Sequence, residues 1–268
     1  YSAEDADSLP PGAAAGAHKS EGAFYIWSEA ELKAALGEGA AAFLHRFGVQ
    51  ADGNAPDDPH GEFTGKNILY AANTLEETAK KLGLTQGEAR RSLEASRKAL
   101  FELRAKRPRP HRDEKVLASW NGLALSALAK GWQSLEDPRY LAAARETARF
   151  LKGALWDAKA KRLKRRWADG EAAVDGLAED YAFLAQGLTD LFEASFEPEW
   201  LEWAVELQEA LEARHSDGNG GYAQAPKDGG GDLFARLGGE HDGAEPSASS
   251  VAAMNLLRLS QLVERPAW

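Results

Sequence analysis

A recurring pair of unlike helical segments constrains the fold of this chain more than any other feature. In each pair the first segment is apolar on most faces, and the second carries one apolar stripe opposite a charged face. A helix that is apolar all round must be covered all round, whereas a helix with one stripe is wet on its other side. Repeated alternation of the two kinds predicts an inner and an outer layer of helices.

The alternation extends through the second half of the chain. Inner-type and outer-type segments follow one another in this order: residues 118–135, 141–155, 181–192, 200–211 and 251–262. Tyr181 follows Trp120 by 61 residues and precedes Ser249 by 68 residues, and this period suits one helical hairpin plus a long loop. A straight solenoid of helix pairs is the alternative arrangement.

We therefore predict an all-α fold, an incomplete (α/α)6 toroid, in a single domain over residues 1–268. Residues 1–110 form its irregular N-terminal portion with long loops, and residues 111–268 form regular helical hairpins. The two ends of the sequence predict a piece of a longer protein. Inner faces left uncovered by missing helices predict self-association of the chain.

Three helices are expected in the N-terminal portion. The first covers residues 28–36 and begins with a capping box, in which Ser28 is followed three residues later by Glu31. The other two cover residues 74–82 and 86–104.

Composition excludes several classes of function. A net charge of −10 disfavours a nucleic-acid surface, which needs clustered cations to neutralise phosphates. The absence of cysteine excludes disulfides and thiolate metal sites, and it fits a cytoplasmic location. No apolar run approaches the roughly 20 residues of a membrane span. We find no phosphate-binding loop or dinucleotide fingerprint, and we predict no cofactor.

The N-termini of parallel inner helices gather at one end of a toroid. We call this end the rim; it comprises residues 111–115, 120–121, 179–181 and 241–247. Its aromatic rings, carboxylates and imidazoles suit a carbohydrate-like small molecule, since sugars need paired polar contacts and flat apolar faces. The predicted catalytic residues are His111, Glu179, His241 and Glu245. The predicted substrate-binding residues are His60, Asp113, Trp120, Asn121, Asp180, Tyr181 and Asp242.

Some of these residues have a simpler interpretation. Asp180 is able to cap its own helix, and Pro246 suits a first helical position with Glu245 or Ser247 as the cap. His60 lies beside Asp58 in a long polar loop, but the spacing matches no known ligand pattern, so we predict no metal site.

Several motifs resemble the thioredoxin-domain-containing proteins related to spermatogenesis-associated protein 20. The motifs lie, in order along the chain, at residues 1–8, 21–27, 61–67, 107–111, 115–123, 179–182 and 242–247. The resemblance implies an N-terminal thioredoxin-like domain, absent here, followed by a six-hairpin toroid like those of glycosidases and N-acylglucosamine 2-epimerases. This chain would be the middle of that toroid, and the missing thioredoxin-like domain would be its partner.

Three functions remain open at this point. In a sugar epimerase or isomerase, His111 or His241 would move a proton at a carbon beside a carbonyl, oriented by Glu179 or Glu245. In a glycoside hydrolase, two carboxylates would flank the bond. The third function is a non-catalytic binding or scaffold module for the thioredoxin-like domain.

Overall fold

The structure, a computed structural model, describes residues 2–14, 16–55, 58, 61–228, 236–238 and 241–265. These residues form two compact units: one is Ala3–Asp113, and the other runs from Glu114 onward and includes Ser2. We refer to them as the N-terminal unit and the C-terminal unit, and each is described separately. That both belong to one toroid domain stays a prediction.

The N-terminal unit consists of short helices around a small apolar core. Its elements are β1 (Ala3–Glu4), β2 (Asp7–Ser8), β3 (Ser20–Glu21), α1 (Glu29–Leu36), the 3-10 helix η1 (Gly37–Gly39), α2 (Ala40–Arg46), α3 (Leu75–Leu82), α4 (Gln86–Arg104) and β4 (Arg112–Asp113). Strand β1 pairs with β4 and β2 with β3, both antiparallel. The three predicted helices are confirmed, and each begins with a capping box, at Ser28, Thr74 and Thr85.

Arg107 fixes the loop that leads into α1. Its guanidinium lies 3.7 Å from the centre of the Trp27 ring, and donates hydrogen bonds to the carbonyls of Phe24 and Ile26 at 3.1 and 2.7 Å. Glu31 lies 3.6 Å away as a counter-charge. Stacking on one face and hydrogen bonds at the edge hold the Trp27 indole in one orientation.

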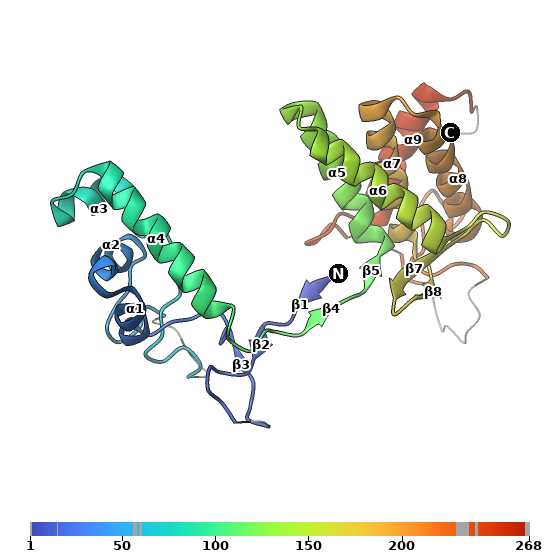
Figure 1. Cartoon of the computed structure of the whole chain (residues 1–268). Helices are drawn as coiled ribbons and strands as arrows, with labels where there is room; N and C mark the ends of the chain where they lie inside the picture. The colour runs from blue at the N-terminus through green and yellow to red at the C-terminus, as the bar shows by residue number, and fades with distance from the viewer. Residues whose placement is uncertain are drawn as a thin grey trace. The chain divides into compact units, whose positions relative to one another are not determined.

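The C-terminal unit has helices where the sequence predicts them, although the predicted inner helices at residues 118–135 and 251–262 each leave one side exposed. Its elements are β5 (Val116–Leu117), α5 (Ala118–Leu135), α6 (Pro138–Leu155), β6 (Trp156–Asp157), β7 (Arg162–Ala168), β8 (Glu171–Asp175), α7 (Ala178–Ser195), α8 (Pro198–His215) and α9 (Ala248–Leu262). Helix α7 is buried on nearly every face and packs against α5, α8 and α9, whereas α6 buries one stripe (Figure 1). The two-layered arrangement of an incomplete α/α toroid is confirmed.

Helices α5 and α7 approach closely because glycine lies at their crossing. A Cβ atom added at Gly122 would lie 2.6 Å from the backbone nitrogen of Leu184, and one added at Gly187 would lie 2.8 Å from the Cβ of Leu125. Side chains at these positions would push the helices apart. The pair of glycines therefore sets the spacing between two neighbouring inner helices.

A small antiparallel sheet accompanies the helices, and the sequence patterns did not predict it. Strand β7 is central and pairs with β5, β6 and β8. The β7–β8 hairpin turns at Asp169-Gly170, both with positive φ, as a two-residue hairpin loop requires. Since β5 runs into α5 and a single loop joins β8 to α7, the sheet lies next to the N-termini of both helices.

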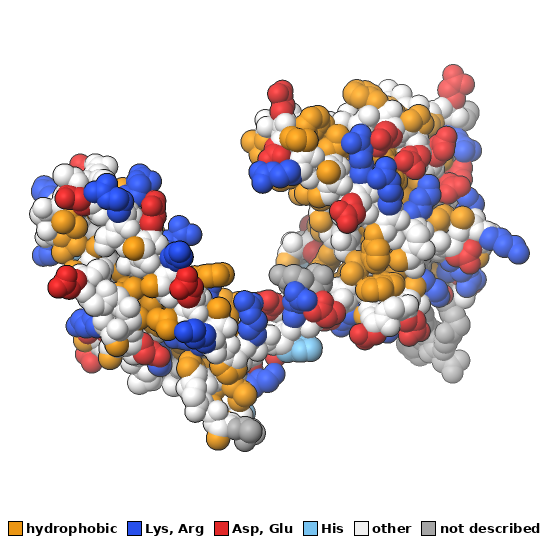
Figure 2. All heavy atoms as spheres, in the orientation of Figure 1, with side chains coloured by type: hydrophobic (Ala, Val, Ile, Leu, Met, Phe, Trp, Pro, Cys, Tyr) orange, Lys and Arg blue, Asp and Glu red, His pale blue; other side chains and the backbone are white. Residues whose placement is uncertain are grey.

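The surface carries charges of both signs. On the face shown in Figure 2, acidic and basic side chains alternate over both units. Within the described part of the chain, no helix is both long and apolar enough to cross a membrane.

Replacing Gly122 by alanine tests the helix crossing. We expect Gly122→Ala to lower the free energy of unfolding by about 2–3 kcal/mol, because the added methyl group overlaps the backbone of α7. Urea unfolding followed by circular dichroism measures the change. The control is Gly153→Ala in α6, where no atom lies within 4 Å of the added Cβ; this substitution should be neutral or stabilise by up to about 1 kcal/mol. Equal effects of the two substitutions would contradict the crossing.

Candidate functional site

A hollow of about 320 Å³ lies at the N-terminal ends of α7 and α9. It is lined by Glu179, Gln224, His241, Gly243, Ala244, Glu245, Pro246, Ser247 and Ala248. Three of the four predicted catalytic residues, Glu179, His241 and Glu245, therefore line one cavity. They come from two helix N-termini whose sequences are more than 60 residues apart.

Trp120 connects α5 to this hollow. Its indole N–H donates a 2.7 Å hydrogen bond to Oε1 of Glu245. The side chain is 41% exposed, so its ring offers a flat apolar face to solvent. An aromatic platform and a carboxylate are thereby held side by side, although they are 125 residues apart in the sequence.

The turn before α9 is shaped by its own polar groups. Oδ1 of Asp242 accepts a 2.7 Å hydrogen bond from the N–H of Ser247, and Oγ of Ser247 accepts one from the N–H of Ser250 at 3.0 Å. Ser247 is the N-cap, as one predicted alternative had it. The prediction that Pro246 is the first helical residue is wrong, because Pro246 precedes the cap.

Arg165, on strand β7, lies between the two carboxylates that begin α7. One of its guanidinium nitrogens is 2.8 Å from Oε1 of Glu179 and 3.0 Å from Oδ2 of Asp180. Burial lowers the pKa of Arg165, but the two carboxylates raise it more, so that it ends above its ordinary value. The guanidinium is thus a fixed positive charge next to Glu179.

Asp180 is fully buried and joins two helices. Its Oδ1 accepts the N–H of Ser119 at 3.1 Å, at the N-terminus of α5, and its Oδ2 accepts the N–H of Leu177 at 2.9 Å, at the N-terminus of α7. Burial raises the pKa of Asp180, while Arg165 and these N–H groups oppose that shift. The side chain predicted to bind substrate instead satisfies helix N-termini, because burial leaves none of it exposed.

Two further predicted contact residues serve the packing. Tyr181 is 1% exposed, and its hydroxyl accepts a 2.9 Å hydrogen bond from the N–H of Leu163 on β7. The amide of Asn121 donates to the carbonyl of Leu117 at 2.8 Å, one turn back in the chain. The Tyr181 side chain therefore lies in the core and is not accessible to a ligand in the hollow.

The remaining predicted residues lie elsewhere in the chain. His111 and Asp113 belong to the N-terminal unit, where His111 is exposed and Asp113 ends strand β4. Their participation at the rim stays a prediction. His60 lies outside the described residues.

Sequence reasoning missed Arg165 and Gln224. Arg165 lies on a strand, and the one signal for that strand is the dipeptide Asp169-Gly170, which favours a two-residue hairpin loop. Gln224 carries no such signal. It reaches the hollow because its carbonyl accepts the N–H of Ala178 at 3.0 Å.

His215, at the end of α8, is a buried imidazole behind the rim. Its ring centre lies 5.3 Å from that of Tyr181, and its Nδ1 lies 3.1 Å from the carbonyl oxygen of Ala223. Burial lowers the pKa of His215 from 6.5 to about 4, and the nearby Arg214 contributes in the same direction. The histidine is therefore neutral at physiological pH.

Comparison with known proteins identifies relatives over the whole chain. No family model matches it. Mouse spermatogenesis-associated protein 20 is 39% identical over 289 aligned residues, which cover 100% of this chain and 36% of the mouse protein, and the human protein gives the same values. This chain is a homologue of spermatogenesis-associated protein 20. The resemblance expected from its motifs is confirmed, and the chain spans about a third of the length of spermatogenesis-associated protein 20.

Solved structures align with this homologue of spermatogenesis-associated protein 20 over part of their length. A cellobiose 2-epimerase from Spirochaeta thermophila aligns with a TM-score of 0.47 and 24% identity, over 59% of this chain and 41% of that one. A glycoside hydrolase of family 105 from C. acetobutylicum aligns with a TM-score of 0.48 and 14% identity, over 72% and 56%.

Substituting the paired acids separates helix capping from a solvent-facing role. We expect Asp180→Asn to lower the free energy of unfolding by about 2–3 kcal/mol, because an amide NH2 group replaces an oxygen that accepts hydrogen bonds in a buried place. Glu179→Gln, which faces the same guanidinium but is partly exposed, should cost less than about 1 kcal/mol. Urea unfolding at pH 7 measures both. Similar losses for the two variants would contradict the assignment of Asp180 as the shared cap.

The buried imidazole predicts a pH dependence. Between pH 6.5 and about 4 the unfolded chain binds a proton at residue 215 that the folded chain does not, so stability falls as pH falls through this window. The full contribution, on the order of 3 kcal/mol, is present above pH 6.5. His215→Asn retains a hydrogen-bond donor and should flatten the dependence, measured as unfolding free energy at pH 4.5, 5.5 and 7. Equal slopes in both proteins would argue against a neutral buried His215.

Proposed function

We propose that the rim binds a sugar or a sugar-like polyol. The observation that carries the proposal is the hollow in which Glu179, His241 and Glu245 meet, with the exposed ring of Trp120 hydrogen-bonded to Glu245. Carboxylates accept hydrogen bonds from sugar hydroxyls, and an indole face packs against the C–H groups of a pyranose ring. A polar cavity next to an exposed aromatic ring offers both kinds of contact.

The same groups support an epimerase or isomerase reaction. In this reaction His241 is the base that takes a proton from the carbon beside the carbonyl of an open-chain sugar. Return of a proton to the opposite face of that carbon completes an epimerisation without any change of oxidation state. Arg165 holds Glu179, and Trp120 holds Glu245, so both carboxylates are oriented to bind substrate hydroxyls. This chemistry needs no cofactor.

A second candidate function is a binding module that serves the thioredoxin-like domain expected from the family resemblance. One observation favours it: both carboxylates of the hollow already have partners within the unit, Arg165 and Trp120. Carboxylates held by such partners are suited to binding a ligand in a fixed orientation as well as to catalysis. In this case sugar binding would be absent or would proceed without proton transfer.

Binding and proton transfer are measured separately. A thermal-shift screen with monosaccharides, N-acyl sugars and disaccharides should show stabilisation of roughly 2.7 kcal/mol at a hundred times the dissociation constant. Sugars that bind are then incubated in D₂O, and NMR should show deuterium at the carbon beside the carbonyl. Release of a monosaccharide from a disaccharide would instead indicate a hydrolase.

Two variants locate the activity. Trp120→Phe keeps a ring but loses the donor to Glu245, and it should weaken sugar binding about tenfold. His241→Ala should leave binding within a few-fold and abolish deuterium incorporation, since His241 is exposed and its loss leaves the core unchanged. If no sugar shifts the melting temperature, carbohydrate binding at the rim is wrong for this chain. If sugars bind without exchange, the binding module becomes the better description.

A further inference from the structure

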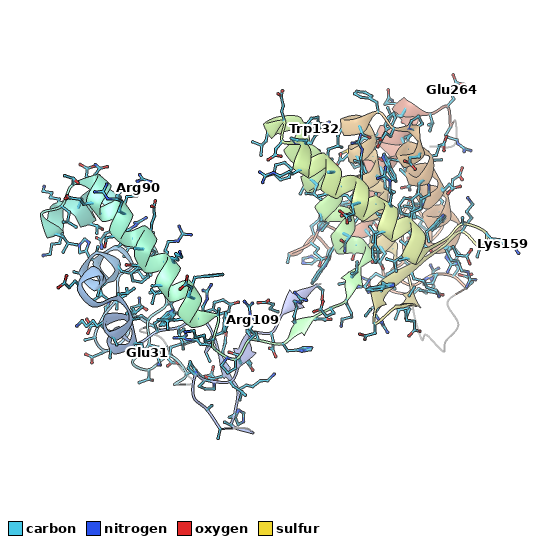
Figure 3. The ribbon with its side chains drawn as sticks, in the orientation of Figure 1. Glu31, Arg90, Arg109, Trp132, Lys159 and Glu264 are labelled. Atoms are coloured by element: carbon cyan, nitrogen blue, oxygen red, sulfur yellow. The ribbon has the colours of Figure 1, made fainter. Side chains whose placement is uncertain are left out.

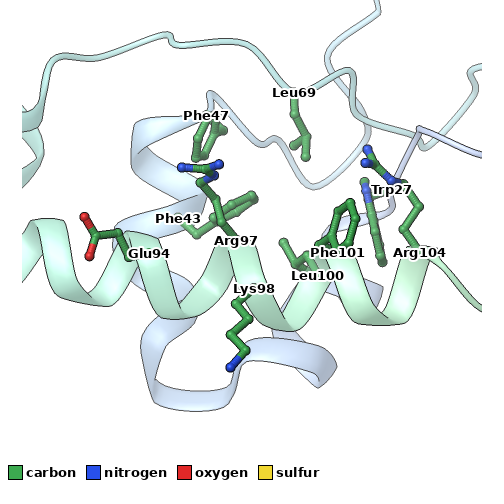
Figure 4. A pocket seen from close by; sticks show the side chains of 10 residues that line it. All are labelled: Trp27, Phe43, Phe47, Leu69, Glu94, Arg97, Lys98, Leu100, Phe101 and Arg104. Carbon is green, nitrogen blue, oxygen red and sulfur yellow. The ribbon is translucent and has the colours of Figure 1, made fainter. Parts of the chain in front are cut away.

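The N-terminal unit contains a second and larger hollow, which the proposed function does not use. Its volume is about 610 Å³, within the range of small-molecule sites. Helix α4 forms one side of it, and α2 with the chain near Leu69 forms the other (Figure 4). It is lined by Trp27, Phe43, Phe47, Leu69, Glu94, Arg97, Lys98, Leu100, Phe101 and Arg104.

The middle of this hollow is apolar and lined by aromatic rings. Phe43 and Leu100 are 3% and 5% exposed and form its floor, while Phe101 is 61% exposed at its edge. Packing a flat apolar group against a largely exposed aromatic ring is favourable, because it removes apolar surface from water. The hollow therefore suits a ligand with a planar apolar body.

One end of the hollow offers hydrogen-bond donors that lack acceptors. Trp27 is 5% exposed, and within the described part of the chain its indole N–H has no hydrogen-bond partner. Figure 4 shows its nitrogen at the same end as the Arg104 guanidinium. The Arg104 guanidinium lies 5.4, 5.5 and 5.8 Å from the ring centres of Tyr25, Phe24 and Phe101, and among the described residues it pairs with no carboxylate.

The indole is not free to turn away from the hollow. Arg107 stacks on the Trp27 ring at 3.7 Å and is itself held by backbone carbonyls. A fixed donor and a nearby guanidinium match a carboxylate, which accepts from both and matches the charge of arginine. A neutral acceptor would satisfy the indole but not the guanidinium.

We propose that this hollow binds an aromatic carboxylate, with its ring against Phe43, Leu100 and Phe101 and its carboxylate between Trp27 and Arg104. The other cations of the lining, Arg97 and Lys98, outnumber its one carboxylate, Glu94, so the charge of the hollow favours an anion.

The test compares a charged and a neutral probe of equal shape. Isothermal titration of the whole chain with 2-naphthoate and with 2-naphthamide should show at least tenfold tighter binding of the carboxylate. Arg104→Gln should weaken naphthoate binding about tenfold and leave amide binding nearly unchanged. Trp27→Phe removes a donor that both probes use, so it should weaken the binding of both. Arg90→Gln is the matched control, because Arg90 lies near the start of α4, outside the hollow, and it should have no effect (Figure 3).

Circular dichroism melts check that each variant folds. Arg104→Gln alters a side chain outside the core, so it remains informative if Trp27→Phe proves unstable. The proposal is overturned if naphthoate does not bind, if the amide binds equally well, or if Arg104→Gln leaves the affinity unchanged. A concentration-dependent dimer that Phe101→Ser abolishes would assign the hollow to a second copy of the chain, and would overturn it as well.

Discussion

The rim depends on one buried carboxylate. Asp180 accepts N–H groups from the first turns of α5 and α7 and pairs with Arg165 of the sheet, so a single side chain ties three elements together. Neither helix has a side-chain cap from its own N-cap residue, which is a leucine in both. Asp180 therefore satisfies one N–H group at the start of its own helix and one at the start of α5. Trp120 follows Ser119 in the sequence, and Glu179 precedes Asp180. The positions of both residues therefore depend on this contact.

The same arrangement explains why acids accumulate at the rim. Negative charge at a helix N-terminus is stabilised by the helix dipole, and Glu179 and Asp180 both occupy the first turn of α7. The two residues differ in burial, and they therefore have different roles. Asp180 is enclosed and structural, whereas Glu179 shares Arg165 and reaches the hollow. A doublet of acids at such a place thus carries one cap and one residue that a ligand can reach.

The helices were predictable because their signals are local. Apolar periodicity set the bounds of α5 and α6, and the Ser28 capping box set the start of α1. The sheet was missed because its strands are short and rich in charge. The Trp120–Glu245 hydrogen bond could not be predicted from the sequence, because no local pattern in either segment indicates a partner 125 residues away. Tyr181 was misjudged for a related reason: a residue near a helix start can face the core or the cavity, and only packing decides which.

The central position of α7 determines the order in which parts of the C-terminal unit unfold locally. Helix α7 packs against helices on several sides, and Gly122 and Gly187 bring its backbone against that of α5. Helix α9, by contrast, exposes Met254 and Leu257 and packs mainly against α7. Local opening should therefore begin at α9 and reach α7 last, so that amide protons of α7 exchange with solvent only when the whole unit unfolds.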